Sequence, residues 1–149
     1  MIFRLLLPLL AAGVAHAVVL RQDLLRPLAR PLCGRLFGAN KTWRGVAVML
    51  GVTAPVALLL GLPPLLGAAL ALGYSLGELP NSYVKRRLGI EPGARGRRVQ
   101  YIADQGDSAL GASLGAIAFI DLRTAALLLA VGFAVHAGFD RLLYVVHVK

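Results

Sequence analysis

Long apolar runs, broken by two strongly charged stretches, are the feature that most constrains the fold of this chain. Of its 149 residues, 58% are hydrophobic and 15% are charged, whereas about 25% of the residues of a typical soluble domain are charged. Segments this apolar are suited to a lipid bilayer. We therefore expect an all-α integral membrane protein that folds as a single domain over residues 1–149.

The apolar runs predict a bundle of about five transmembrane helices. Each run is close to, or slightly shorter than, the ~20 residues that cross ~30 Å of hydrocarbon at ~1.5 Å per residue. The predicted spans are roughly 2–20, 45–61, 65–82, 106–120 and 124–146. The first run also resembles a signal peptide, because it ends in the small-x-small pattern Ala15-His16-Ala17. Cleavage there would send a basic loop outward, so we expect this span to be retained.

The basic residues set the orientation of these spans. The net charge is +9, and most of the 16 Lys and Arg residues lie in two loops, 21–44 and 83–105. Because cytoplasmic loops carry an excess of positive charge, we expect both loops inside, the N-terminus outside and the C-terminus in the cytoplasm of a plasma (inner) membrane protein. Two basic loops between apolar spans favour anionic phosphate as a partner, and they argue against nucleic acid, which meets a broader basic surface.

Three carboxylates around the second basic loop are candidates for a metal site. Asp104 and Asp107 stand three residues apart, so both would face the same way on a helix. Mg²⁺ commonly takes one or two carboxylates together with water and substrate phosphate. An acidic first turn that complements the helix dipole is the alternative. Glu78, near the cytoplasmic end of the third span, needs a cation nearby, which is either a metal or one of Lys85 and Arg86.

Two basic blocks are candidates for binding phosphate groups. Lys41-Thr42-Trp43-Arg44-Gly45 stands at the start of the second span, where free backbone donors also favour an anion, although a Trp there is typical of a membrane-interface anchor. Lys85-Arg86-Arg87 offers a point charge and two planar guanidinium groups. Basic triplets at the cytoplasmic end of a span are also ordinary topology signals.

Other features of the spans fit either helix packing or a site. Pro80 is expected to disturb the third helix, because it removes a backbone donor, and broken helices are tolerated mainly where they line a cavity. Asn81 adds a polar group at this break. His136, Asp140 and Tyr144 would lie along one helix face, either for interhelical hydrogen bonds or to line the site.

Small residues indicate where helices could meet. Gly73 and Gly77 are four residues apart, as are Gly111 and Gly115. Such pairs let membrane helices approach closely. The alternative is that they only reflect the abundance of glycine, of which the chain has 17.

Together, these blocks resemble the CDP-archaeol synthase family, which is related to the phosphatidate cytidylyltransferases. The family pattern has a K-T-W-R-G block before the second span, a G-D-x-x-x-S-x-x-K-R-R-x-G block at the end of the third, a D-Q-x-D block at the start of the fourth, and His, Asn and Tyr at four-residue steps in the last. The matching residues here are Lys41 to Gly45; Gly77, Glu78, Ser82 and Lys85 to Arg87; Asp104 to Asp107; and His136, Asp140 and Tyr144. The family's Asp is Glu78 here, and its final Asn is Asp140.

The resemblance implies a membrane cytidylyltransferase that transfers CMP from CTP to a lipid phosphate of the archaetidic- or phosphatidic-acid type, forming a CDP-lipid and pyrophosphate with Mg²⁺. It implies catalytic roles for Lys85, Arg86, Asp104 and Asp107, and metal binding by Glu78 together with the two aspartates. The residues expected to bind the nucleotide and phosphate groups are Lys41, Thr42, Arg44, Ser82, Lys85, Arg86 and Arg87. It leaves open whether the enzyme is a homodimer.

The sequence also bears on two other functions. A CDP-alcohol phosphatidyltransferase has a D-G-x-x-A-R start, which Glu91-Pro92-Gly93-Ala94-Arg95 lacks, and the gap between Asp104 and Asp107 is wrong for that family. The alternative that stays open is an inactive or non-enzymatic small membrane protein that binds anionic lipid or phosphate. Unlike the enzyme, such a protein would need neither Mg²⁺ nor CTP.

Overall fold

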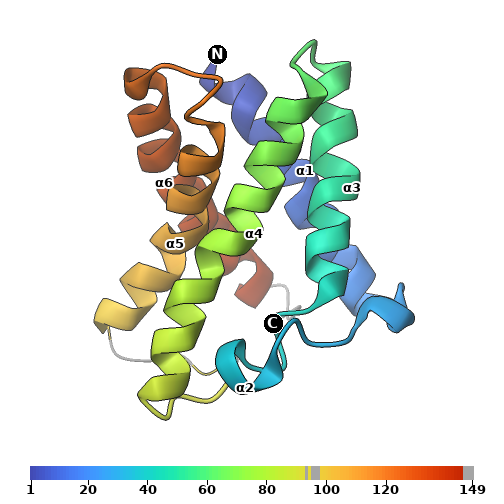
Figure 1. Cartoon of the computed structure of the whole chain (residues 1–149), viewed down its shortest axis with the longest axis vertical. Helices are drawn as coiled ribbons and strands as arrows, with labels where there is room; N and C mark the ends of the chain where they lie inside the picture. Colours follow the sequence, from blue (N-terminus) through green and yellow to red (C-terminus); the bar gives the residue numbers. More distant parts are fainter. Residues whose placement is uncertain (93, 95–97, 146–149) are drawn as a thin grey trace.

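The computed structural model describes residues 1–92, 94 and 98–145, without the side chains of residues 98, 99, 140, 143 and 144. Within this part of the chain the fold is all-α, as the sequence predicts, and the only β pairing is an isolated bridge between Pro31 and Thr42. The elements are α1 (Ile2–Arg21), the 3₁₀ helix η1 (Arg26–Leu28), α2 (Gly34–Phe37), α3 (Trp43–Leu59), α4 (Pro64–Arg87), α5 (Arg98–Ala116) and α6 (Leu122–Val145) (Figure 1).

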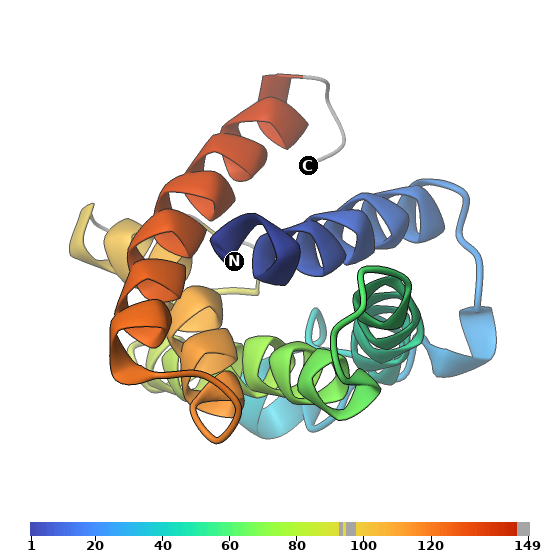
Figure 2. The ribbon, with the colours of Figure 1, turned by 90° about the horizontal axis from the view of Figure 1, so that it is seen from above.

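The five long helices form two layers. Helix α4 packs between α3 and α5, while α1 packs on α3 and α6 packs on α5. Seen from above, α1 and α6 lie on the same side of the layer made by α3, α4 and α5 (Figure 2). Buried leucines join the two layers, with Leu5 and Leu6 on α1, Leu66 and Leu70 on α4 and Leu128 on α6.

Helix α4 differs from the prediction at its polar end. It runs without a break from Pro64 to Arg87, so the expectation that Pro80 disturbs the helix is wrong. A proline removes only one backbone donor, and α4 packs against both α3 and α5. All polar side chains of this end therefore project from a single rigid element.

Helix α5 begins well before the predicted start of the fourth span. It starts at Arg98, which places Asp104 and Asp107 in its second and third turns, and the first turn holds no acidic residue. The two aspartates therefore do not serve to complement the helix dipole at its N-terminus. The prediction was late because it followed the onset of apolar residues, whereas the helix extends into the polar segment.

Two described segments are long and apolar enough to cross a membrane. They are α1 and residues Leu122–Phe139 of α6. Helix α3 is also apolar but has only 17 residues. Helices α4 and α5 carry charged side chains at one end, which lowers their hydropathy. Five membrane spans and the sides on which the termini lie remain predictions.

The interpretation of the glycine pairs as helix contacts is confirmed. A Cβ atom on Gly77 would lie 2.5 Å from the carbonyl oxygen of Asp107 and 2.8 Å from the Cα atom of Gly111. A Cβ atom on Gly73 would overlap the backbone of Gly111, and one on Gly115 would overlap that of Ala69. Because no side chain separates these two helices, the residues that flank the glycines are brought within hydrogen-bond reach of one another.

We expect Gly111→Ala to destabilise the bundle, because the added methyl group meets backbone atoms of α4 that have no room to move. Overpacking of this kind typically costs about 1–3 kcal/mol, and the temperature of unfolding followed by circular dichroism should fall. Gly51→Ala is the matched control, since nothing lies within 4 Å of the new Cβ atom on α3. Equal unfolding temperatures for Gly111→Ala and the unmodified protein would contradict the close contact.

Candidate active site

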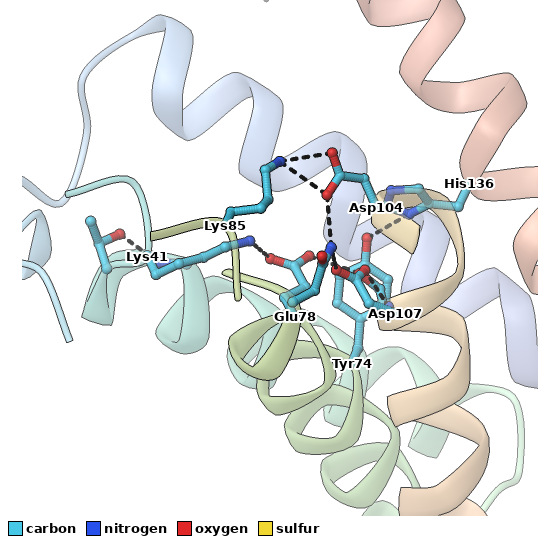
Figure 3. A network of polar contacts seen from close by, with 11 residues as sticks. Lys41, Tyr74, Glu78, Lys85, Asp104, Asp107 and His136 are labelled. Carbon is cyan, nitrogen blue, oxygen red and sulfur yellow. Dashed lines mark hydrogen bonds and ion pairs between the residues drawn. The ribbon is translucent and has the colours of Figure 1, made fainter. Parts of the chain in front are cut away.

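The predicted site residues of α4 and α5 face each other at the polar end of the bundle. Glu78, Asn81 and Lys85 recur at three- and four-residue steps, so they lie along one face of α4. Asp104 and Asp107 stand opposite on α5 (Figure 3). The glycine contact just described sets the short distance between these two faces.

Asn81 joins the two aspartates. Its Nδ2 atom donates hydrogen bonds to Asp104 Oδ1 and to Asp107 Oδ2, both at 2.7 Å. Gln100 donates to the Oδ1 atom of Asn81 and so holds the amide in this orientation. The two carboxylates therefore converge on a single atom, where one cation could reach both.

Ser108 links the third carboxylate to the other two. Its hydroxyl lies 2.9 Å from Glu78 Oε1 and 3.1 Å from Asp107 Oδ1, and it can donate to either. Its backbone N–H donates to Asp107 Oδ1 at 2.6 Å. Glu78, Asp104 and Asp107 thus belong to one connected polar network.

Two lysines neutralise this network from different parts of the chain. Lys41, in the segment before α3, forms an ion pair with Glu78, and Lys85 donates to both oxygens of Asp104 at 2.8 and 3.0 Å. The sequence-based pairing of Glu78 with Lys85 or Arg86 is therefore wrong. Lys85 is seven residues from Glu78, about 10 Å along the helix axis, whereas Lys41 reaches Glu78 from the facing wall.

Lys41 is charged at neutral pH. Burial opposes its ammonium group, but the adjacent Glu78 carboxylate outweighs this effect and raises the pKa of Lys41 above its ordinary value. Its side chain is only 21% exposed. The ion pair is thus a fixed part of the described site rather than a loose surface contact.

These residues line a cavity of about 750 Å³, within the range of about 300–1,000 Å³ typical of small-molecule sites. Its walls come from all five long helices and from the segment that precedes α3. The predicted residues that line it are Lys41, Thr42, Glu78, Ser82, Lys85, Arg86, Asp104 and Asp107. Segments from both ends of the chain therefore contribute to one cavity that holds the charged groups.

Arg86 is the predicted cation that the described residues leave without a partner. Its Nε and Nη1 atoms are buried and have no hydrogen-bond acceptor there. A buried charged donor without an acceptor is costly. The guanidinium lining the cavity is therefore suited to an incoming anion.

Three other predicted residues have structural partners. The Thr42 hydroxyl accepts a hydrogen bond from the Gly45 N–H, so it caps α3 while lining the cavity. Arg44 is not among the lining residues, because its Nη1 atom donates to Asp23 Oδ1 at 3.0 Å and to the Leu24 carbonyl. Its hydrogen bond holds the pKa of Asp23 below the ordinary value.

Arg87 also lies outside the cavity lining. It donates to the Tyr83 hydroxyl at 3.0 Å, and its guanidinium lies 5.2 Å from the centre of that ring. The basic triplet is thus divided: Lys85 and Arg86 line the cavity, while Arg87 stays on the outer surface.

His136 both makes a contact between helices and lines the cavity, which are the two roles that the sequence allows. Its Nδ1 atom lies 2.9 Å from the Tyr74 hydroxyl, which joins α6 to α4, and both residues line the polar cavity. Both also line a smaller apolar pocket of about 50 Å³ between α1 and α6. The side chains of Asp140 and Tyr144 lie outside the described part of the structure.

The carboxylates fit a magnesium ion in part. Among the residues described, no group of three or more His, Cys, Asp or Glu side chains is placed to hold a metal. Asp104 and Asp107, which meet at Asn81, match the one or two carboxylates that Mg²⁺ usually takes when water and phosphate complete its shell. Glu78 instead gives one oxygen to Lys41 and the other to Ser108.

Sequence reasoning missed the residues that connect the charged groups. Ser108 and Gln100 were not predicted, and Asn81 was noted only as a neighbour of Pro80. A signal was present: Asn81 lies between Glu78 and Lys85 at helical spacing, and Gln100 lies one turn before Asp104.

Comparisons with known proteins bear on the family. No family model matches the chain, and no solved structure matches it at a significant level. Over 90 residues, the chain is 37% identical to a protein named CDP-archaeol synthase from Sulfolobus acidocaldarius, and the match covers 57% of this chain. The chain spans about half the length of this curated relative, with 53% of it covered. This similarity to a CDP-archaeol synthase supports the family resemblance that the motifs show.

Proposed function

We propose that this protein is a CTP-dependent lipid cytidylyltransferase. One observation carries the proposal: two converging aspartates lie on the wall of the same cavity as Lys41, Lys85 and Arg86. Carboxylates beside several cations suit a metal-bound polyphosphate. The similarity to a CDP-archaeol synthase supports a lipid phosphate as the acceptor.

The outer faces of α4 and α5 support a position of both helices in the membrane. Leu72 and Leu76 on α4 and Leu110 and Leu114 on α5 are between 40% and 58% exposed. Exposed apolar surface of this kind is suited to lipid rather than water. In our proposal five helices cross the plasma membrane, and the polar cavity opens to the cytoplasm, where CTP is found.

The reaction needs alignment and charge neutralisation more than a protein nucleophile. A phosphate oxygen of the lipid attacks the α-phosphorus of CTP, the bond from that phosphorus to the β-phosphate bridging oxygen breaks, and pyrophosphate leaves with the electron pair. The attacking oxygen is already ionised, so no general base is required. The chain therefore has to hold two anionic groups in line and offset their repulsion.

Different residues of the site have different roles in binding the two anionic groups. In our proposal Lys41, Lys85 and Arg86 bind phosphate oxygens, with the hydroxyls of Thr42 and Ser82 beside them. Arg44 and Arg87 support the walls through their contacts with Asp23 and Tyr83.

Asp104 and Asp107 would hold Mg²⁺, with Glu78 as the neighbour that keeps Lys41 in place. When bound, the ion would neutralise the triphosphate and stabilise the attacking and leaving oxygens.

The proposed function is tested by incubating the purified full chain with radiolabelled CTP, Mg²⁺ and a panel of ether- and ester-linked lipid phosphates. We expect a labelled CDP-lipid with at least one acceptor and none after chelation with EDTA. If no acceptor consumes CTP, the non-enzymatic alternative gains support and the proposal fails.

We expect Asp107→Asn to lower CDP-lipid formation by at least about 10²-fold, the scale of one lost preorganised electrostatic group. The substitution keeps the shape of the side chain, so the unfolding temperature should hardly change. Asp121→Asn is the control, because Asp121 caps α6 at the other end of the bundle through Thr124 and Asn is also a good cap. Wild-type turnover in Asp107→Asn would remove the metal role.

The orientation is tested with Cys33, the one cysteine of the chain, which is partly exposed and lies in the basic loop predicted to be cytoplasmic. A membrane-impermeant maleimide should label it only after the cells are permeabilised. In a Cys33→Ser background, Arg123→Cys should react in intact cells, because that turn is predicted outside. Equal labelling of Cys33 in intact and permeabilised cells would overturn this topology.

A further inference from the structure

The charges around the cavity are balanced before any ligand binds. Among the described residues that line it, three carboxylates face three cations: Glu78, Asp104 and Asp107 against Lys41, Lys85 and Arg86. Two of these cations already form ion pairs with carboxylates. A metal at Asp104 or a phosphate at Lys85 would therefore have to break the ion pair between these two residues.

A divalent cation alone is expected to bind weakly at this site. Lys85 occupies both oxygens of Asp104, and its side chain is only 11% exposed. A metal held by Asp104 and Asp107 would displace the ammonium into a cavity whose remaining described carboxylate, Glu78, is already paired with Lys41. The displaced charge and the new ion would repel each other in a partly buried environment.

A triphosphate alone would also bind weakly, because it would take cations away from the carboxylates that they neutralise. If Lys41 and Lys85 turned towards the phosphates, Glu78 and Asp104 would lose their counter-ions. The carboxylates would then face one another and the incoming anion across the same cavity. Only the Arg86 guanidinium could meet the phosphates without breaking an ion pair among the described residues.

The two ligands together remove both difficulties. The metal replaces Lys85 at Asp104 and the phosphates accept Lys85, while Lys41 stays paired with Glu78, so every charge that loses a partner gains another. We propose that Lys85 acts as an exchangeable counter-ion, which makes the site bind divalent metal and CTP cooperatively and each of them weakly alone. This inference rests on the proposed function. By linkage, CTP must tighten metal binding by the same factor as metal tightens CTP binding.

The test measures metal binding rather than turnover. The full chain in detergent, without lipid acceptor, is titrated with Mn²⁺ while the electron paramagnetic resonance signal of the free ion is recorded, with and without CTP. A parallel titration without protein accounts for Mn²⁺ bound by CTP in solution. We expect CTP to tighten Mn²⁺ binding about tenfold or more, within the range of about 5- to 150-fold for coupled sites.

The decisive variant is Lys85→Met, which keeps the length of the side chain and removes its charge. Mn²⁺ alone should bind about tenfold tighter than to the unmodified protein, since no ammonium has to be displaced. The factor by which CTP tightens Mn²⁺ binding should be smaller than in the unmodified protein. Lys85→Gln is the second variant, used if the unfolding temperature shows that Lys85→Met does not fold.

Arg87→Met is the matched control. It removes the same charge from the same helix two residues further on, but Arg87 lies outside the cavity lining and contacts Tyr83. Mn²⁺ affinity should not change. If Arg87→Met tightens Mn²⁺ binding as much as Lys85→Met does, the effect comes only from the loss of one positive charge near the site. The proposed exchange is then refuted.

The remaining outcomes separate the two proposals. Equal Mn²⁺ affinity with and without CTP, or no Mn²⁺ binding in either case, overturns the cooperative exchange. If the same preparation still forms a CDP-lipid in the radiolabel assay, the proposed function stands. If metal and CTP bind cooperatively but no lipid phosphate is converted, the exchange stands and the proposed function fails.

Discussion

The contact between the backbones of α4 and α5 determines the geometry of the candidate site. Gly73 and Gly77 on α4 face Gly111 and Gly115 on α5, with no room for a Cβ atom between several of them. In a membrane, helices associate mainly through such close packing and through polar contacts, since lipid removes most of the hydrophobic driving force. The same contact that stabilises the pair brings the acids of α5 against the polar face of α4.

The polar network is stable because its described members satisfy one another. Ionisable groups within membrane helices are expensive unless they are paired or face a cavity, and here Lys85 pairs with Asp104 while Asn81 and Ser108 bridge the carboxylates. Arg86 departs from this pattern, with two buried donor atoms that lack an acceptor among the described residues. The cavity therefore combines charged groups that are already paired with one guanidinium that is suited to bind an anion.

Much of the fold could be predicted from the distribution of apolar and charged residues. The helical class and the role of the two glycine pairs as helix contacts followed from composition and spacing, although not which glycine meets which, and most predicted site residues line one cavity. The ion pair between Lys41 and Glu78 could not be predicted, because it joins residues far apart in the chain. The start of α5 and the unbroken path through Pro80 were also missed, since both depend on packing between helices rather than on local sequence.

The two pockets that meet at Tyr74 and His136 have different origins. The carboxylates and their counter-ions come from α4, α5 and the segment before α3, whereas most residues of the apolar pocket belong to α1 and α6. Substitutions of the α1 and α6 residues that line only the apolar pocket can therefore change its shape while the charged groups keep their geometry. Under the proposed function, such a division would let the apolar part adapt to membranes of different composition without altering the charged groups.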